Sequence, residues 1–249
     1  MPDMSTPSEN VTLTTADGPM TAYDARPEAE LGAGGRGGVI VVQEAFGVNA
    51  HIEDVTRRLA AAGYRAVAPH VFHRSGDPEL SYDDLPAVLP HMQALTAEGL
   101  LADIDATVEY LTDGGLPQSR IAVIGFCMGG SVAAFVAARR RLGAAVSFYG
   151  GGVAEGRFGM PPLVELAPEF VTPWLGLYGD QDQGIPVDQA EALRDAALRA
   201  SVPTELMIYE GAAHGFHCDA RPQAFHEAAA ADAWKRTLSW LEDNLAQPR

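Results

Sequence analysis

The sequence predicts an α/β protein with a doubly wound, mainly parallel sheet flanked by helices. Short apolar runs alternate with segments of helical period, which is the order that parallel strands and their crossover helices require. Some runs are apolar throughout, such as Val-Ile-Val-Val at 39–42, as in strands covered on both faces. With 249 residues and 47% hydrophobic content, the chain can form one large core, and we expect a single domain over 1–249.

The chain begins with a predicted β-hairpin. Residues 11–15 and 20–23 flank an Asp-Gly-Pro turn at 17–19, and residues 1–10 are polar and expected to be flexible. Downstream, apolar runs predict strands at 39–42, 65–69, 121–126, 144–149, 174–178 and 205–209. Helical patterns are expected at 52–62, 100–111, 186–200 and along the apolar stripe of 234–245, with a loop or short helix at 75–90.

Charge and cysteine content exclude several classes of function. A formal net charge of −16 and a pI near 4.7 oppose binding to nucleic acid or to an anionic membrane. We find no apolar stretch that could span a bilayer and no signal-peptide pattern at 1–10. Two cysteines, Cys127 and Cys218, cannot form a disulfide framework. We therefore expect a cytoplasmic protein that acts on a small molecule, as a monomer or small homo-oligomer.

A sharp strand-to-helix turn is predicted at 125–129, where the sequence is Gly-Phe-Cys-Met-Gly. This is the cysteine form of the G-x-S-x-G nucleophile elbow, in which glycines make room for a strained nucleophile. Cys127 would then project beyond the sheet edge, and the backbone amide of Met128 would lie at a helix start that favours anionic oxygen and thiolate. The alternative is a buried cysteine that packs as a small hydrophobe, which leaves the glycines unexplained.

Possible partners of Cys127 follow the last two predicted strands. Asp180 and Asp182 come after one strand, and His214 comes after the next. Nucleophile, acid and histidine in this chain order are typical of the α/β-hydrolase fold. A thiol needs a base, and the base needs an orienting carboxylate. Either aspartate could instead stabilise a turn, and a single loop histidine could simply be solvated.

The chain resembles the dienelactone hydrolase (carboxymethylenebutenolidase) family of the α/β-hydrolase superfamily, whose members are cysteine-dependent enzymes that open enol-lactone rings. The matching motifs are Gln-Glu-Ala-Phe-Gly-Val-Asn at 43–49, the elbow at 125–130, Gly-x-x-Asp at 179–182 and Ala-His-Gly-Phe at 213–216. The resemblance implies a triad of Cys127 as nucleophile, Asp182 as orienting acid and His214 as base, which cleaves a lactone or small ester through an acyl-enzyme.

Glu44 is a fourth catalytic residue by this resemblance. In relatives the matching glutamate interacts with the cysteine in the resting enzyme and moves when substrate binds, so that thiolate forms only when it is needed. Such control suits a thiol, because a standing thiolate is readily oxidised. The alternative is that Glu44 only favours the first turn of the following helix.

Further residues are predicted to form the oxyanion hole and the pocket. The backbone amides of Ala45 and Met128 are expected to bind the oxyanion. By resemblance, Phe46, Tyr149 and Phe216 are candidates for the walls of the substrate pocket. Aromatic residues at strand ends are usually part of the core, which is the alternative for these rings.

One departure from the family concerns substrate charge. Relatives that act on dienelactone hold its carboxylate with two arginines, one in the helical stretch that matches 85–92 and one shortly after the histidine motif. Here the first stretch has no basic residue and Cys218 occupies the second place, with Arg221 nearby. We therefore expect a pocket without an evident cation, which processes neutral lactones or esters better than the matched carboxylates.

Two alternatives belong to other classes. A flavodoxin-like cysteine enzyme also places a cysteine at an elbow, but it does not need an acid and a histidine on two later strands. The second alternative is a protein that keeps the fold with weak or no hydrolase activity. We expect no cofactor and no metal, because the pairs His70/His73 and His214/His217 have no further ligand at metal spacing.

Overall fold

The structure, a computed structural model, describes residues 6–28 and 35–245. Within these residues, eight strands form one sheet in the order β1-β2-β4-β3-β5-β6-β7-β8. β1 (Ser8–Thr15) and β2 (Gly18–Ala25) form an antiparallel hairpin, and β2 pairs antiparallel with β4. The pairings from β4 through β8 are parallel. The mainly parallel sheet with an N-terminal hairpin is therefore confirmed.

The other elements lie close to their predicted positions. The strands are β3 (Gly38–Val42), β4 (Arg65–Pro69), β5 (Ile121–Phe126), β6 (Ala144–Phe148), β7 (Trp174–Gly179) and β8 (Thr204–Tyr209). The helices are α1 (Ala50–Ala61), α2 (Leu85–Gln93), α3 (Ala97–Asp113), α4 (Met128–Arg139), α5 (Leu163–Leu166), α6 (Val187–Ala197) and α7 (Glu227–Leu245). α2 overlaps the segment expected to hold a loop or short helix, and α5 was not predicted.

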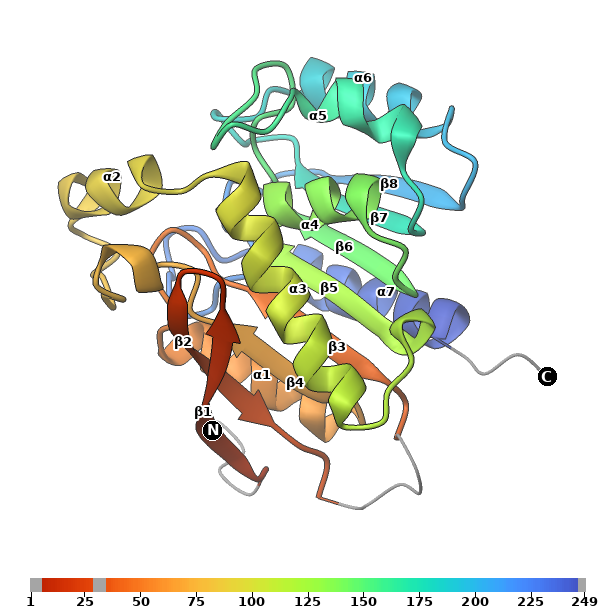
Figure 1. The fold of residues 1–249 in the computed structure, drawn as a ribbon. Helices are drawn as coiled ribbons and strands as arrows, with labels where there is room; N and C mark the ends of the chain where they lie inside the picture. Colours follow the sequence, from red (N-terminus) through yellow and green to blue (C-terminus); the bar gives the residue numbers. More distant parts are fainter. Residues whose placement is uncertain (1–5, 29–34, 246–249) are drawn as a thin grey trace.

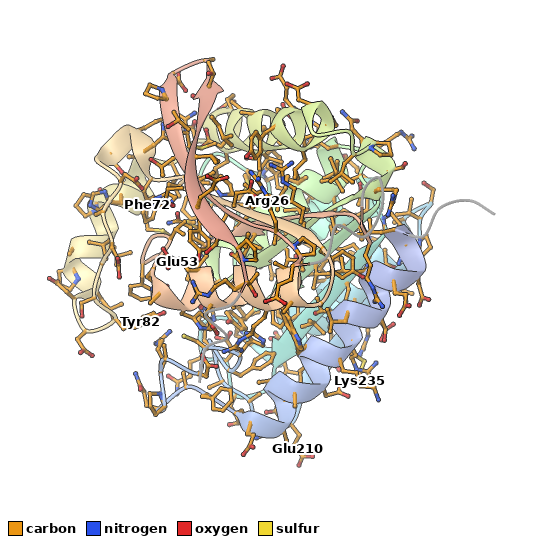
Figure 2. All side chains as sticks on the ribbon, turned by 90° about the horizontal axis from the view of Figure 1, so that it is seen from below. Arg26, Glu53, Phe72, Tyr82, Glu210 and Lys235 are labelled. Atoms are coloured by element: carbon orange, nitrogen blue, oxygen red, sulfur yellow. The ribbon has the colours of Figure 1, made fainter. Side chains whose placement is uncertain are left out.

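Helices cover both faces of the sheet (Figure 1). α1 and α7 pack on one face, and α3, α4 and α6 lie on the other. β3 and β5 at the centre are buried along their whole length, which explains why their sequences are apolar at every position. Figure 2 shows Lys235 on α7, on the side that faces away from the sheet.

Buried apolar side chains from all eight strands join one main core cluster. Residues 8–10 belong to β1, so the expectation of a flexible N-terminus is wrong for them. Residues 1–5 lie outside the described residues. None of the helices within 6–28 and 35–245 combines the length and the apolar character needed to cross a lipid bilayer.

Candidate active site

Cys127 occupies the turn between β5 and α4. Its φ of 53° and ψ of −114° lie in a region that L-residues rarely adopt, at a cost of about 1–3 kcal/mol. Backbone hydrogen bonds hold this conformation. The Cys127 amide donates to the Phe148 carbonyl at 3.0 Å, and the Cys127 carbonyl accepts from the amides of Gly130 at 3.0 Å and Ser131 at 3.3 Å. The turn therefore fixes the thiol at the start of α4.

The glycines of the elbow are required by close backbone packing. A Cβ atom on Gly125 would overlap the carbonyl oxygen of Gly129, and one on Gly129 would overlap the carbonyl oxygen of Val42. Only glycine lets β3, β5 and α4 approach this closely. Cys127 itself is partly exposed, so it is not the fully buried cysteine of the alternative interpretation.

His214 and Asp182 form an ion pair beyond the carboxyl ends of β7 and β8. His214 Nδ1 lies 2.7 Å from Asp182 Oδ2. The Asp182 side chain is buried, and its Oδ1 accepts hydrogen bonds from the amides of Gly184 at 2.9 Å and Ile185 at 3.1 Å. With the carboxylate fixed in this way, His214 donates from Nδ1, and Nε2 remains for other proton transfers.

Asp180, the other candidate acid, has a different partner. Its Oδ1 accepts a hydrogen bond from the Gly211 amide at 2.8 Å, which joins the loop after β7 to the loop after β8. Of the two aspartates between which the sequence left a choice, Asp182 is the one that contacts His214.

The surroundings of His214 favour its charged form. Burial lowers its pKa, but the charge of Cys127 and hydrogen bonds to Asp182 and Cys127 outweigh burial and raise the pKa to about 10. A negative neighbour stabilises imidazolium, and imidazolium stabilises a thiolate in return. The charge of Cys127 and the contact with Asp182 thus favour the imidazolium form of His214.

A cavity of about 420 Å³ joins these side chains. It is lined by Cys127, Gly151, Arg157, Gln181, Asp182, Gln183, Gly184, Ile185, Ala213 and His214. Its wall contains Arg157 in addition to His214, so the expectation of a pocket without an evident cation is wrong. The sequence analysis missed Arg157. The signal that could have found it is its position in the loop after β6, at the edge of the sheet where ligands bind.

Glu44 lies in the loop after β3 and is 1% exposed. Its Oε1 accepts a hydrogen bond from the Tyr149 hydroxyl at 3.3 Å, whereas its Oε2 has no partner among the described residues. Burial and the charge of Glu44 raise the pKa of Tyr149 well above its usual value, so Tyr149 keeps its proton. The acidic residue in the first turn of α1 is Glu53, which excludes that role for Glu44.

The two predicted oxyanion-hole residues lie on adjacent segments. Ala45 follows Glu44 in the loop after β3, and Met128 is the first residue of α4. Gly129, the next residue of α4, lies against the carbonyl oxygens of Val42 and Gln43. The loop after β3 and the start of α4 are therefore side by side.

The three aromatic residues expected to line the pocket are not among the residues that line this cavity. Tyr149 and Phe216 are fully buried, with ring centroids 5.3 Å apart, so both rings belong to the core and not to the cavity wall. The Phe46 ring packs against Tyr82 at 4.6 Å. The Arg221 guanidinium lies over these last two rings, 5.7 Å from Phe46 and 5.3 Å from Tyr82, and does not line the cavity either.

Comparison with known proteins identifies the family. A sequence profile described as "Dienelactone hydrolase family" matches residues 20–245. The chain belongs to this family. It is 41% identical over 225 residues to a Salmonella typhimurium protein named "Putative carboxymethylenebutenolidase", across 89% of this chain and 82% of the relative. A relative of the same name in Escherichia coli K12 is 39% identical over 226 residues, across 90% of this chain and 82% of the relative.

A solved structure described as "Putative Dienelactone Hydrolase from Klebsiella pneumoniae" has the same fold as this dienelactone hydrolase family member. Its TM-score is 0.87 at 37% identity, with 95% of this chain and 98% of that chain covered. The chain is thus a hydrolase of the dienelactone hydrolase type, acting on lactone or ester bonds, and its sheet is that of an α/β-hydrolase. The flavodoxin-like alternative is wrong.

Proposed function

We propose that this member of the dienelactone hydrolase family opens an enol-lactone or cleaves a small ester through a triad of Cys127, His214 and Asp182. One observation carries the proposal: Cys127 and His214 line the same cavity, while Asp182 holds His214 Nδ1 at 2.7 Å. The positions of the three residues after β5, β7 and β8 support it, because this is the chain order of α/β-hydrolases.

The first half-reaction forms an acyl-enzyme. The Cys127 thiolate attacks the carbonyl carbon of the substrate. The oxyanion that develops accepts hydrogen bonds from the backbone amides of Ala45 and Met128. His214 donates its proton to the leaving oxygen, the carbon–oxygen bond breaks, and a thioester remains on Cys127. In a lactone the released oxygen stays on the same molecule as an enol or alcohol.

The second half-reaction returns the enzyme to its starting state. His214, now neutral, takes a proton from a water molecule, and the hydroxide attacks the thioester carbonyl. The carbon–sulfur bond breaks, the product leaves as a carboxylic acid, and Cys127 is again a thiolate beside protonated His214. Asp182 fixes the tautomer of His214 and stabilises the imidazolium in both halves.

Glu44 is suited to control the charge of the nucleophile. In the arrangement described here its Oε1 accepts a hydrogen bond from the Tyr149 hydroxyl. A carboxylate that turned towards Cys127 instead would disfavour the thiolate, because like charges repel in a buried site. Oε2 of Glu44 has no hydrogen-bond partner among the described residues, which supports such movement, since one of its two oxygens is not held.

The test is direct detection of the acyl-enzyme. We expect rapid mixing with p-nitrophenyl acetate, followed by acid quench and peptide mass spectrometry, to show an acetyl group on the peptide that contains Cys127. Cys127→Ala should show no adduct and no turnover. An adduct on another residue would overturn the proposed triad, and an intact protein that cleaves no ester or lactone in a broad screen would favour the alternative without hydrolase activity.

A further inference from the structure

Tyr149, directly after β6, has a backbone conformation that large side chains rarely adopt. Its φ is 39°, in the left-handed region where a bulky residue is strained. The sheet holds this conformation, because the Tyr149 amide donates to the carbonyl of Leu177 on β7 at 2.8 Å. Cys127, at the end of the neighbouring strand β5, is also strained, with a φ of 53°. The direction of the Tyr149 side chain is therefore fixed at a conformational cost, as is common at functional sites.

The Tyr149 side chain reaches both His214 and Glu44. Its ring centroid lies 5.1 Å from that of His214 and 6.3 Å from that of Phe126, the residue before Cys127. The side chain is fully buried, so its hydroxyl cannot turn to solvent. This hydroxyl donates to Glu44 Oε1 at 3.3 Å. One strained side chain thus connects the proposed base with the acidic residue that is suited to control the nucleophile.

Tyr149 is the side chain that holds the Glu44 carboxylate. Within residues 6–28 and 35–245, Oε1 accepts a hydrogen bond from the Tyr149 hydroxyl, and Oε2 has no partner. Two other protic groups, Tyr82 and Cys218, lie close enough for the charge of Glu44 to act on them. Burial first, and this charge in addition, raise the pKa of Cys218 to about 12 and those of Tyr82 and Tyr149 above their usual value. All three groups therefore keep their protons at physiological pH, and none is a cation.

We propose that Tyr149 is a positioning residue whose hydroxyl holds the Glu44 carboxylate away from Cys127 in the free enzyme, so that the thiolate can form. The inference rests on the proposed function, in which Glu44 controls the charge of Cys127. It differs from the resting state that the family resemblance implies, where the glutamate interacts with the cysteine. A hydrogen bond of 3.3 Å between two oxygens is long, so Glu44 can leave Tyr149 at small cost. Tyr149 then sets how often Glu44 turns towards the sulfur.

The test measures how much thiolate Cys127 carries, without any turnover. Iodoacetamide reacts with the thiolate and not with the thiol, and mass spectrometry of the peptide that contains Cys127 separates its alkylation from that of Cys218. We expect Tyr149→Phe to lower the alkylation rate of Cys127 by about tenfold at the acidic end of the pH profile, because a carboxylate released towards the sulfur repels the thiolate. The rates should converge at high pH, where both proteins carry the thiolate.

Glu44→Gln separates positioning from a merely structural role. A neutral amide cannot repel a thiolate, so Tyr149→Phe made in the Glu44→Gln protein should change the alkylation rate by less than about twofold. A structural role of the hydroxyl would lower the rate equally in both backgrounds. Glu44→Gln alone should raise the rate by no more than about twofold, because in the wild-type protein Tyr149 already holds the charge away from Cys127. This last measurement needs no change at Tyr149.

Tyr178→Phe is the matched control. Tyr178 on β7 is also fully buried, and its hydroxyl donates to the carbonyl of Gly150 at 3.1 Å. The substitution removes the same atom from an equally buried ring but does not release Glu44. Its alkylation profile should therefore stay within about twofold of wild type. Urea unfolding midpoints, measured on every variant, show that the alkylation rates belong to folded protein.

Three results would overturn the role of Tyr149. They are a wild-type alkylation profile in Tyr149→Phe, an equal fall in both backgrounds, and a marked rise of the rate in Glu44→Gln alone, which would mean that Glu44 already faces Cys127. Failure of the proposed function has a different signature, because ester turnover would survive Cys127→Ala or the acyl group would appear on another residue. Alkylation and acyl-enzyme detection therefore test the two hypotheses separately.

Discussion

Residues 214–218 run from the catalytic cavity into the packed interior beside it. The two environments shift the pKa values of His214 and His217 in opposite directions. At the cavity, His214 contacts Asp182, and its pKa is raised to about 10. His217 is 3% exposed among the rings of Phe126, Phe148 and Trp234. Burial, with His51 and Arg58 nearby, lowers its pKa to about 3. Burial and charged neighbours, and not residue type, therefore decide which histidine is protonated at neutral pH.

The two cysteines differ in the same way. Cys127 is partly exposed at the start of α4 and faces His214. Cys218 is fully buried, its Sγ lies 3.5 Å from the Tyr82 hydroxyl, and burial together with the charge of Glu44 raises its pKa to about 12. Cys218 therefore remains a thiol at any physiological pH. The contrast predicts that turnover depends on Cys127 and His214 and not on Cys218 and His217.

The largest expected effect separates the cysteines. Cys127→Ala should abolish turnover of p-nitrophenyl butyrate and leave the urea unfolding midpoint near wild type, because a partly exposed corner residue adds little to the core. Cys218→Ala should retain turnover within a few-fold. Loss of turnover in Cys218→Ala at unchanged stability would show that the buried thiol takes part in the reaction.

The next effect tests the acid. Asp182→Asn should lower kcat by several orders of magnitude, roughly 10⁴-fold as in the best-studied serine triad, because His214 would lose its orienting carboxylate. Asp180→Asn, which keeps a side chain able to accept the Gly211 hydrogen bond, is the control and should stay within about tenfold. Steady-state kinetics on both variants shows which aspartate orients His214. Equal losses of kcat would mean that Asp182 acts only through the loop conformation.

A third measurement follows the protonation of the two histidines by NMR on isotope-labelled protein. His214 should titrate near pH 10 and His217 near pH 3. kcat/KM should fall as the pH rises through about 10, since neutral His214 cannot protonate the leaving oxygen. The charge of His214 also stabilises the fold fully below its unfolded pKa of 6.5, and this contribution is lost as the pH rises through 10. A His214 resonance that titrates near 6.5 would remove the proposed ion pair with Cys127.

The smallest effect concerns stability alone. Nδ1 of His217 is buried without a hydrogen-bond partner among the described residues, which costs free energy. His217→Leu removes this atom at similar volume and should raise the free energy of unfolding by about 1 kcal/mol, with turnover within about twofold. Urea denaturation and ester hydrolysis on the same preparation check both parts. A marked loss of turnover would place His217 in the reaction.

Local patterns were sufficient to predict the sheet and the sharp turn at Cys127. The buried strands are apolar throughout, and the elbow glycines are needed because β3, β5 and α4 touch there, so both features are visible in the chain order. The choice between Asp180 and Asp182 was harder, because it depends on which carboxylate the amides of Gly184 and Ile185 hold. A single sequence does not show such turn geometry.

The walls of the site were predicted least well. Arg157 lies in a glycine-containing loop without period, and its position depends on contacts with Gly151 and Gly152 that only the folded chain reveals. Tyr149 and Phe216 were expected on the cavity wall, but a strand-end aromatic can face the core or the solvent, and here core packing prevails. Side-chain direction at loop positions is set by tertiary contacts, which is why it was not predicted.

The order of the strands has a consequence for how the enzyme becomes active during folding. Cys127 follows β5, whereas His214 follows β8, the edge strand that pairs with β7. Parallel strands join through long connections and pair slowly, because distant segments of chain must meet first. Helical signal should therefore return early when denatured protein is diluted into buffer, and hydrolysis should return later. The time at which turnover recovers reports the docking of β8.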